Sequence, residues 1–516
     1  MKKQRFLKFL PALITAALLL VPLAHARDID VILRNGEVLD GSGSPPIHTD
    51  VGISGDRIAF VGSSAGKKAK RVIDATGLII TPGFIDPHTH TAGDLSDPKR
   101  RQNTPYLMQG VTTVATGNDG DSPENIGDTL ATWNKQGIGT NAVLFIGQGT
   151  VRREVMGMSD AKPTPEQMRK MEALVNTAMN EGAIGLSTGL YYAPGSYSTT
   201  EEVIALARVA ARHGGIYDTH MRDESSYNIG LLNAVRETLR IGKEADIPVM
   251  ISHIKALGAD VWGQSKDVIA LIDAARAAGI QATASQYPYD ASGTSVTASL
   301  VPRWAEANGN LLKNIDDPNL HARLVKEMTE NLRRRGGAET LLMTSAKDKS
   351  IVGKNLAQIA QERHVSPIEA ALEIIRAGGS DVASFNMKES DIEAFMKQPW
   401  VMTCSDGSTG HPRKYGTFPR KIHVYVYEKH VLSLEAAVRS STSLPAKTLQ
   451  LKDRGLLKAG YYADVLAFDP KTFIDRATYQ DPTILATGVQ YLLVNGQFAV
   501  DKGKLTSTLA GRALKR

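Results

Sequence analysis

The sequence predicts an α/β protein whose main domain is a closed (β/α)8 barrel. Eight short apolar runs alternate with segments of helical period, which is the pattern of repeated βα units around a parallel sheet. Alternating strands and turns occur near both ends of the chain, which predicts a smaller β domain. The length of 516 residues also favours one large and one small domain over a single core.

The barrel is expected to span residues 81–454. Its eight strands are predicted at 78–85, 112–116, 141–146, 183–187, 215–219, 248–252, 281–285 and 400–404. Helices are expected between them at 164–181, 199–213, 227–245 and 264–278. Residues 295–398 separate the last two strands and are predicted to form an inserted helical subdomain or lid.

The small β domain is expected to combine residues 27–80 with residues 455–505 as a β-sandwich. Short alternating strands are predicted at 30–34, 57–61 and 71–74 near the start, and at 463–469 and 489–494 near the end. Asn495-Gly496 is a strong hairpin turn after the last of these.

The first 26 residues have the pattern of a secretory signal peptide. A basic start precedes an apolar run at 13–23, and Ala24-His25-Ala26 provides small residues for cleavage. The alternative, a membrane anchor, is disfavoured because the run is shorter than the roughly 20 residues needed to span a bilayer. We therefore expect an exported, periplasmic protein that begins at Arg27 and has no stable membrane insertion after cleavage.

The charge balance gives little support for a nucleic-acid partner. The leader carries four basic residues and no acidic one, so its removal lowers the net charge from +6 to +2. The compact basic cluster at 333–335 is expected to be a solvated helix face. The single cysteine, Cys404, cannot form an internal disulfide and is expected in the core.

Four histidines and an acid follow predicted strands and carry the candidate chemistry. His88 and His90 are two positions apart and therefore project to the same side after the first barrel strand. His220, His253 and Asp406 take equivalent places after the fifth, sixth and eighth strands. Active sites of such barrels lie at the carboxyl ends of the strands, so these residues predict a metal site there, with zinc as the expected ion.

The chain resembles the amidohydrolase superfamily and, within it, the N-acyl-D-amino-acid deacylases (D-aminoacylases), across nearly all of the sequence after the leader. The motif PGFIDPHTH at 82–90 marks the superfamily. The narrower matches are GVTT at 110–113, GLSTGLYYAP at 185–194, THMR at 219–222, SHIK at 252–255, YPY at 287–289, HPR at 411–413 and GTFPR at 416–420. The resemblance implies a TIM-like barrel and an amide hydrolase.

The resemblance also implies one or two Zn²⁺ ions. His220 and His253 would hold the tighter ion, whereas His88, His90 and Asp406 would border a weaker position, with Asp406 as general base and acid. No lysine ends the fourth strand, so the carbamylated lysine of dihydroorotase-like relatives has no candidate here.

One position departs from the family pattern. Where these deacylases carry a metal-bridging cysteine, this chain has Asp119 within Gly117-Asn118-Asp119-Gly120. An aspartate can bridge two metals as an oxygen ligand, or Asp119 can be an ordinary turn residue; the sequence leaves both open.

For the substrate, the resemblance places Lys255, Tyr287 and Thr294 around an α-carboxylate, with Tyr191 and Arg222 nearby. Two other arginines, Arg303 and Arg413, are expected in surface ion pairs.

Three functions are compatible with these residues. The first is zinc-dependent hydrolysis of N-acyl-D-amino acids to a carboxylic acid and a free D-amino acid. The second is the same chemistry on a dipeptide, a cyclic amide or an aryl amide of an amino acid. The third, a metal-binding protein without catalysis, is disfavoured because Asp406 provides a proton acceptor. The expected partner is a small molecule, and the sequence leaves a homo-oligomer open.

Overall fold

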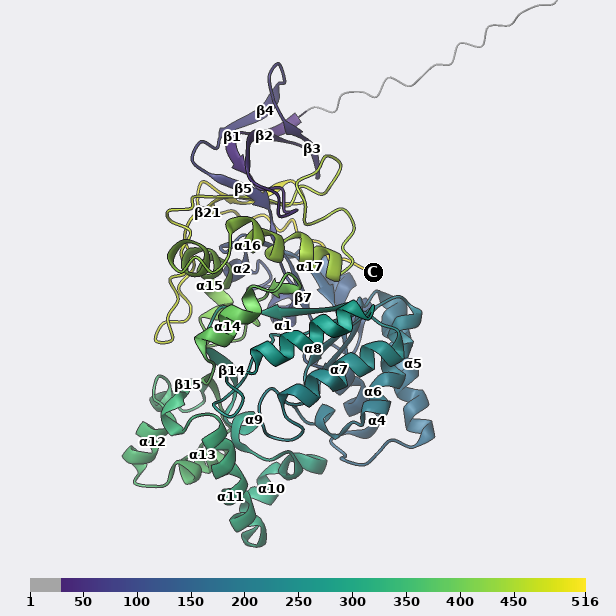
Figure 1. The fold of residues 1–516 in the computed structure, drawn as a ribbon, viewed down its shortest axis with the longest axis vertical. Helices are drawn as coiled ribbons and strands as arrows, with labels where there is room; N and C mark the ends of the chain where they lie inside the picture. The colour runs from purple at the N-terminus through teal and green to yellow at the C-terminus, as the bar shows by residue number, and fades with distance from the viewer. Residues whose placement is uncertain (1–28) are drawn as a thin grey trace, which may run out of the picture.

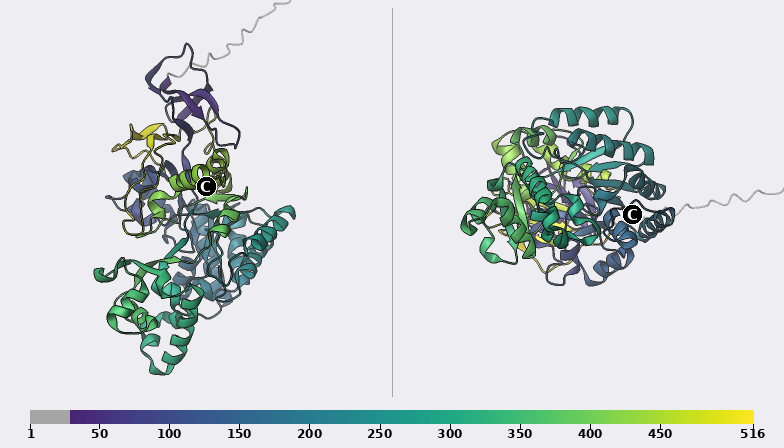
Figure 2. Two further views of the ribbon diagram at one scale, coloured as in Figure 1. Left: turned by 60° about the vertical axis from the view of Figure 1, so that its left-hand side comes forward. Right: turned by 90° about the horizontal axis from the view of Figure 1, so that it is seen from below.

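The computed structural model describes residues 29–516, so the predicted signal peptide lies outside the described residues. Figure 1 shows three regions along the long axis of the molecule: a β-sheet region at the top, the barrel in the middle and a mainly helical subdomain at the lower left. The side view in Figure 2 shows the same succession.

The barrel has the eight parallel strands that the sequence predicts. They are β6 (Phe84–Asp86), β7 (Val111–Thr116), β8 (Asn141–Leu144) continued by β9 (Ile146–Gly147), β10 (Gly185–Gly189), β11 (Ile216–His220), β12 (Val249–Ile251), β13 (Ala282–Gln286) and β17 (Val401–Thr403). Parallel pairing runs from β6 to β8 and from β9 to β17. A parallel bridge between Thr89 and Gly407 joins the ends of the first and last strands and closes the barrel.

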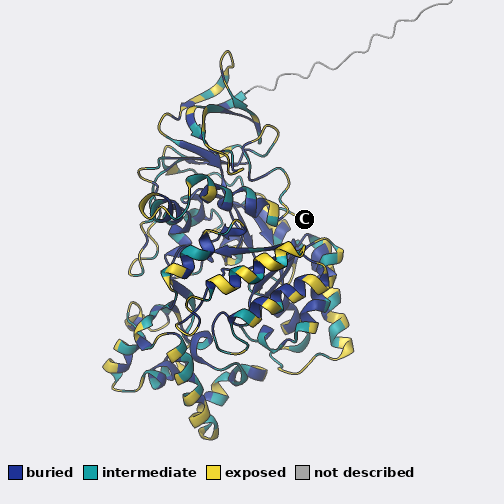
Figure 3. Cartoon of the chain, in the orientation of Figure 1, coloured by how far each residue is buried: buried dark blue, intermediate teal, exposed yellow. Residues whose placement is uncertain are grey.

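Helices cover the outside of the barrel, and Figure 3 shows their buried inner and exposed outer faces. The main ones are α3 (Ile126–Gln136), α4 (Gln148–Met156), α5 (Pro165–Glu181), α6 (Thr200–Arg212), α7 (Leu231–Ala245), α8 (Ser265–Ala277), α14 (Glu389–Met396), α15 (Arg413–Arg420), α16 (Leu434–Ser441) and α17 (Ser443–Thr448). The sequence places the start of α5 well because Thr164 and Gln167 form a capping box there.

Helix α7 begins later than the predicted residue 227. The carboxylate of Asp223 accepts the backbone N–H groups of Ser225, Asn228 and Gly230, which holds this segment as a loop. Such side-chain acceptors compete with helical hydrogen bonds. The loop keeps the residues after β11 beside the carboxyl ends of the strands.

A nine-stranded sheet combines both ends of the described chain. Its order is β21 (Lys504–Leu505), β20 (Gln497–Asp501), β19 (Val489–Val494), β18 (Val465–Phe468), β5 (Ile79–Pro82), β1 (Ile29–Val38), β2 (Ile47–Ser54) and β3 (Arg57–Gly62), with β4 (Ala69–Asp74) also pairing with β1. The Asn495-Gly496 turn joins β19 to β20 with φ of 49° and 78°, as a tight hairpin requires.

The predicted first barrel strand at 78–85 is in fact two strands. β5 belongs to the nine-stranded sheet, and β6 belongs to the barrel. Gly83 lies between them, where an added Cβ would come within 2.2 Å of Thr112. A continuous apolar run does not reveal such a change of sheet, because both strands are buried.

The segment before the last barrel strand forms a subdomain with its own hydrophobic core. It contains α9 (Val296–Leu300), α10 (Leu311–Asp316), α11 (Pro318–Arg334), α12 (Leu356–Arg363) and α13 (Pro367–Arg376). It is not only helical: β14 (Ala291–Ser295), β15 (Leu341–Ala346) and β16 (Ser380–Phe385) form an antiparallel sheet. Its end also differs from the prediction, because Phe395 of α14 packs in the main core.

Lys421 is a buried lysine beside the last barrel strand, β17. It follows α15, and its ammonium donates to the Thr403 hydroxyl at 2.7 Å and to the Ser440 hydroxyl at 2.9 Å. The neighbouring Cys404 is buried, as expected. Burial lowers the pKa of Lys421 from 10.5 to about 7.

We expect Lys421 to make stability depend on pH. The unfolded chain retains this proton up to a higher pH than the folded protein, so the free energy of unfolding should rise between pH about 7 and about 10.5, by at most about 1.4 kcal/mol per pH unit from this group. In Lys421→Met the contribution disappears. Urea unfolding at several pH values measures the free energy of unfolding of both proteins. The excess of Lys421→Met over the wild type should be largest at low pH and should fall as the pH rises; a difference in this free energy that does not depend on pH would contradict the burial argument.

Candidate metal centre

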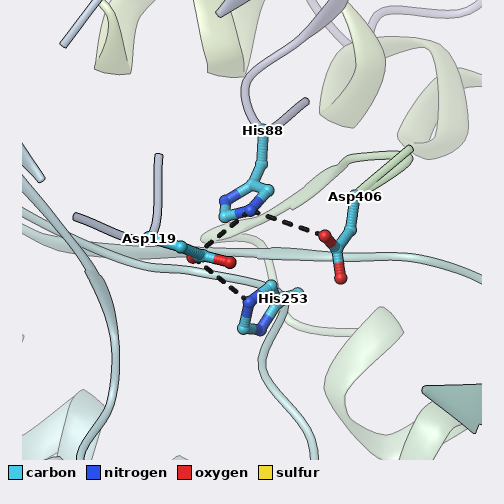
Figure 4. Close-up of side chains that lie close together, drawn as sticks. All are labelled: His88, Asp119, His253 and Asp406. Carbon is cyan, nitrogen blue, oxygen red and sulfur yellow. Dashed lines mark ion pairs between the residues drawn. The ribbon is translucent and has the colours of Figure 1, made fainter. Parts of the chain in front are cut away.

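The predicted ligands meet at the carboxyl ends of the barrel strands, where Figure 4 shows four of them facing one another. Each side chain comes from the end of a strand or from the loop directly after it. They are His88 and His90 after β6, Asp119 after β7, His220 at the end of β11, His253 after β12 and Asp406 after β17.

The carboxylate of Asp119 is at the centre of this group. Its Oδ1 lies 3.4 Å from Nε2 of His88 and 3.5 Å from Nε2 of His253. Its Oδ2 lies 3.5 Å from Nε2 of His90 and 3.8 Å from Nδ1 of His220. The four histidines therefore surround one carboxylate, which favours a ligand role for Asp119 over that of an ordinary turn residue.

The ligand atoms define two adjacent positions that share Asp119. On one side, Nδ1 of His220 and Nε2 of His253 are 3.0 Å apart. On the other side, Oδ1 of Asp406 lies 3.6 Å from Nε2 of His88 and 3.1 Å from Nε2 of His90.

The donor set fits metal ions. Both ring nitrogens of the fully buried His88 and the Oδ1 of Asp119 lack a hydrogen-bond partner. Buried polar atoms normally have hydrogen-bond partners, so unpaired nitrogen and oxygen atoms that converge in this way indicate that an ion binds between them. Imidazole nitrogens and carboxylate oxygens suit a divalent transition metal such as zinc.

Three of these residues have a left-handed backbone. The φ angles are 56° at Asp119, 32° at His253 and 47° at Asp406, which is a costly conformation for residues other than glycine. The fold holds Asp406 in place through backbone bonds: its N–H donates to the carbonyl of His88, and the N–H of Ser405 donates to the carboxylate of Asp86. The strained loops thus aim the ligands inward.

Sequence reasoning missed Glu224, four residues after His220. Its Oε1 lies 3.1 Å from Nδ1 of His253, and its Oε2 lies 3.6 Å from Nε2 of His220. These are the ring nitrogens that do not face Asp119. The available signal was an acid in the loop after a ligand-bearing strand, which is common in loops without any function.

Lys255 contacts both Glu224 and His253. Its ammonium lies 2.7 Å from Oε1 of Glu224 and 2.7 Å from Nδ1 of His253. A cation already there makes Glu224 an outer partner of the histidines rather than a ligand. Carboxylates in this position fix the tautomer and orientation of ligand histidines.

The expectation of a surface ion pair for Arg413 is wrong. The arginine is 1% exposed, and its Nη1 lies 2.7 Å from Oδ2 of Asp406. It begins α15, directly after the loop that carries Asp406. The sequence does not reveal that this loop turns the guanidinium back onto the Asp406 carboxylate. Arg303 does form an ion pair, with Glu306.

The charges around the site keep its carboxylates ionised. Burial favours the neutral acid, but the charge of Arg413 and the neighbouring histidines outweigh it and hold the pKa of Asp406 below its usual value. His88 and His253 similarly lower the pKa of Asp119 against the effect of burial. The pKa of Glu224 is also lowered, because Lys255 and the histidines outweigh burial.

A cavity of about 650 Å³ opens above the ligands. Of the residues predicted to bind substrate, Tyr191, Lys255, Tyr287 and Thr294 line it. The hydroxyl of Tyr287 is buried without a hydrogen-bond partner, so it is free to bind a substrate group.

The prediction for Arg222 is corrected by the structure. Its guanidinium lies outside this cavity, where it pairs with Glu237 at 2.9 Å and donates to the carbonyls of Ser196 and Ser198. Its neighbour in the chain, Glu224, faces the site instead.

The comparisons with known proteins agree with this geometry. Residues 71–500 match the family described as the amidohydrolase family. D-aminoacylase of Alcaligenes xylosoxydans xylosoxydans is 34% identical, over 96% of this chain and 99% of that protein. A solved structure of D-aminoacylase, concerned with its binuclear metal centre, superposes with a TM-score of 0.82 at 35% identity and covers 95% of this chain and all of that one.

A second solved structure is N-acyl-D-glutamate deacylase of Bordetella bronchiseptica, complexed with zinc and a phosphonate that mimics the tetrahedral intermediate. It has a TM-score of 0.83 and 29% identity, with 95% of this chain and 100% of that chain covered. The chain therefore belongs to the amidohydrolase family, a family of metal-dependent hydrolases. Within the family, its full-length relatives include D-aminoacylase and N-acyl-D-glutamate deacylase.

We expect Glu224→Gln to weaken metal binding about 10- to 100-fold, as is usual when a carboxylate behind a ligand histidine is lost. The amide keeps the shape but loses the charge that faces His253 and Lys255. Competition with a chromophoric chelator measures the affinity. Glu201→Gln, at an exposed glutamate, is the matched control, and equal affinities in the two variants would exclude this role for Glu224.

Proposed function

We propose that this protein hydrolyses the amide bond of N-acyl-D-amino acids and releases a carboxylic acid and a free D-amino acid. The observation that carries the proposal is the convergence of four histidines, Asp119 and Asp406 beneath a cavity of substrate size. The full-length similarity to D-aminoacylase and to N-acyl-D-glutamate deacylase supports the choice of substrate.

Zinc is the proposed cofactor, as one or two ions. His220, His253 and Asp119 would hold one ion, whereas His88, His90 and Asp406 would hold the second together with Asp119. When bound, zinc supplies Lewis acidity, which lowers the pKa of water and polarises a carbonyl.

Asp406 is the proposed general base and acid. Its carboxylate accepts the proton of the attacking water and returns a proton to the departing nitrogen. Arg413, at 2.7 Å from Oδ2, fixes the carboxylate and keeps it ionised, while Oδ1 faces His88 and His90. Each of its oxygens therefore has a separate partner.

The cavity wall orients the substrate. The hydroxyls of Tyr287 and Thr294 and the ammonium of Lys255 provide hydrogen-bond donors for an α-carboxylate. Lys255 already pairs with Glu224, so with the substrate bound its ammonium would lie between the Glu224 carboxylate and the α-carboxylate of the substrate. Fixing the α-carboxylate at this wall would hold the scissile amide over the ligands.

We expect release of D-leucine from N-acetyl-D-leucine, with little release of L-leucine from the L enantiomer. A chelator should abolish the activity and zinc should restore it. Asp406→Ala should lower kcat by about 100-fold or more, the usual effect of losing a general acid–base residue. Asp481→Ala, in an exposed loop, is the control.

Amine release from both enantiomers, measured with metal-defined protein, checks these outcomes. Activity that survives complete metal removal, or full activity in Asp406→Ala, would refute the mechanism. If the protein hydrolyses only a dipeptide, a cyclic amide or an aryl amide, that compound would replace N-acyl-D-amino acids as the substrate class.

We also propose that the protein is exported to the periplasm. The leader at 1–26 supports this, and among residues 29–516 the structure contains no helix long and apolar enough to cross a bilayer. Expression of the full chain in a Gram-negative host should yield a periplasmic protein that begins at Arg27. A chain lacking residues 2–26 should stay in the cytoplasm, and an unprocessed full-length chain found there would contradict export.

A further inference from the structure

The basic cluster Arg333–Arg335 at the end of α11 is divided between two environments. Arg333 is solvent-exposed and pairs with Asp260 and Glu330 at 2.8 Å each. Arg335 is only 2% exposed and lines the active-site cavity. The expectation of a solvated helix face is therefore wrong for Arg335.

Arg335 is the one cation of the cavity wall without an acidic partner among the described residues. Each other lysine or arginine of the wall lies within 4.0 Å of a carboxylate; these are Arg100, Arg153, Lys255, Arg413 and Lys414. The comparably buried Arg152 also pairs with an acid, Glu202, at 2.6 Å. A buried charge without a partner is costly, so such an arginine calls for an anion.

The neighbours of Arg335 offer it few acceptors. Its Nε donates to the carbonyl of Ser299 at 3.2 Å, and its Nη2 donates to the hydroxyl of Tyr191 at 3.3 Å. Its Nη1 has no hydrogen-bond partner. The guanidinium lies 5.7 Å from the ring centroid of Tyr227, a second cavity residue whose hydroxyl is also enclosed without a partner. This part of the wall therefore offers the guanidinium two neutral oxygen acceptors, and among the described residues no carboxylate pairs with it.

Arg335 is separated from the metal ligands by one aromatic side chain. The ring of Tyr191 stacks on His220 with 5.7 Å between centroids, and the hydroxyl of Tyr191 meets Arg335. An anion at Arg335 would therefore belong to the end of the substrate away from the scissile amide. The α-carboxylate, which is close to that amide, is expected at Lys255 and Tyr287.

We propose that Arg335 and Tyr227 form a distal subsite that binds a second carboxylate of the substrate. This rests on the proposed deacylase function and narrows it to dianionic N-acyl-D-amino acids. The second carboxylate belongs either to an acidic side chain or to a dicarboxylic acyl group. A guanidinium binds either one through paired charge-assisted hydrogen bonds, and the hydroxyl of Tyr227 adds a further donor.

Three substrates test the subsite: N-acetyl-D-glutamate, its neutral isostere N-acetyl-D-glutamine, and N-succinyl-D-alanine. The wild type should have a higher kcat/KM for a dianionic substrate than for N-acetyl-D-glutamine. Arg335→Met should lower kcat/KM about 10- to 100-fold for that substrate, because hydrogen bonds to charged groups are lost, and change it little for the neutral one. The dianion that is affected shows whether the carboxylate is in the side chain or in the acyl group.

Two further variants separate recognition from a structural role. Arg335→Lys should retain part of the preference, because it keeps the charge without the paired geometry. Tyr227→Phe removes a hydroxyl that has no partner in the protein, so it should keep the thermal midpoint while lowering kcat/KM for the dianion alone. Arg333→Met is the control at an exposed position of the same cluster. If Arg335→Met fails to fold, Tyr227→Phe decides.

The results that would overturn the subsite differ from those that would overturn the deacylase function. Equal losses on all three substrates, or no loss on any, would overturn the subsite. A wild type that cleaves N-acetyl-D-glutamine without preference for either dianion would overturn the subsite and leave the deacylase function in place. A wild type that cleaves none of the three would overturn the deacylase function, and the subsite with it.

Discussion

The contact between the Asp119 carboxylate and four histidines is the interaction on which the rest of the site depends. The histidines come from three different strand ends, and their ring nitrogens lie 3.4 to 3.8 Å from its two oxygens. The turn that presents Asp119 requires a left-handed backbone at three of its four residues. Gly120 in this turn has no room for a side chain, because a Cβ would lie 2.7 Å from the backbone of Gly189.

Two further carboxylates, each paired with a cation, lie around this centre. Glu224 lies behind two of the histidines and is paired with Lys255, whereas Asp406 faces the other two and is paired with Arg413. Glu224 and Asp406 therefore each have a fixed cation beside them, which limits the cost of burying these two carboxylates. The same pairing leaves little unpaired charge at the centre of the site, so Arg335 stands out at the periphery.

The three regions of the fold contribute differently to the cavity. The barrel supplies all of the proposed metal ligands from its strand ends, the part of this fold where loops can vary without disturbing the core. The subdomain between β13 and β17 supplies the outer wall, including Thr294 on β14 and Arg335 after α11. A wall carried on a separate hydrophobic core can change its side chains without altering the ligands below.

The sequence by itself determined the barrel strands, four of the outer helices and the strand-end places of four histidines and Asp406, because period, caps and strand-end positions are local properties of the chain. It also indicated that Asp119 was unusual, although only the structure showed four histidines around it. Glu224, Arg413 and Arg335 became recognisable only in the tertiary structure. Each is a charged residue in a loop or at a helix end, where sequence looks the same for solvated and buried side chains. Glu224 and Arg413 are distinguished by their contacts with the proposed ligands, and Arg335 by the absence of an acidic partner among the described residues. Neither feature is encoded in the local pattern.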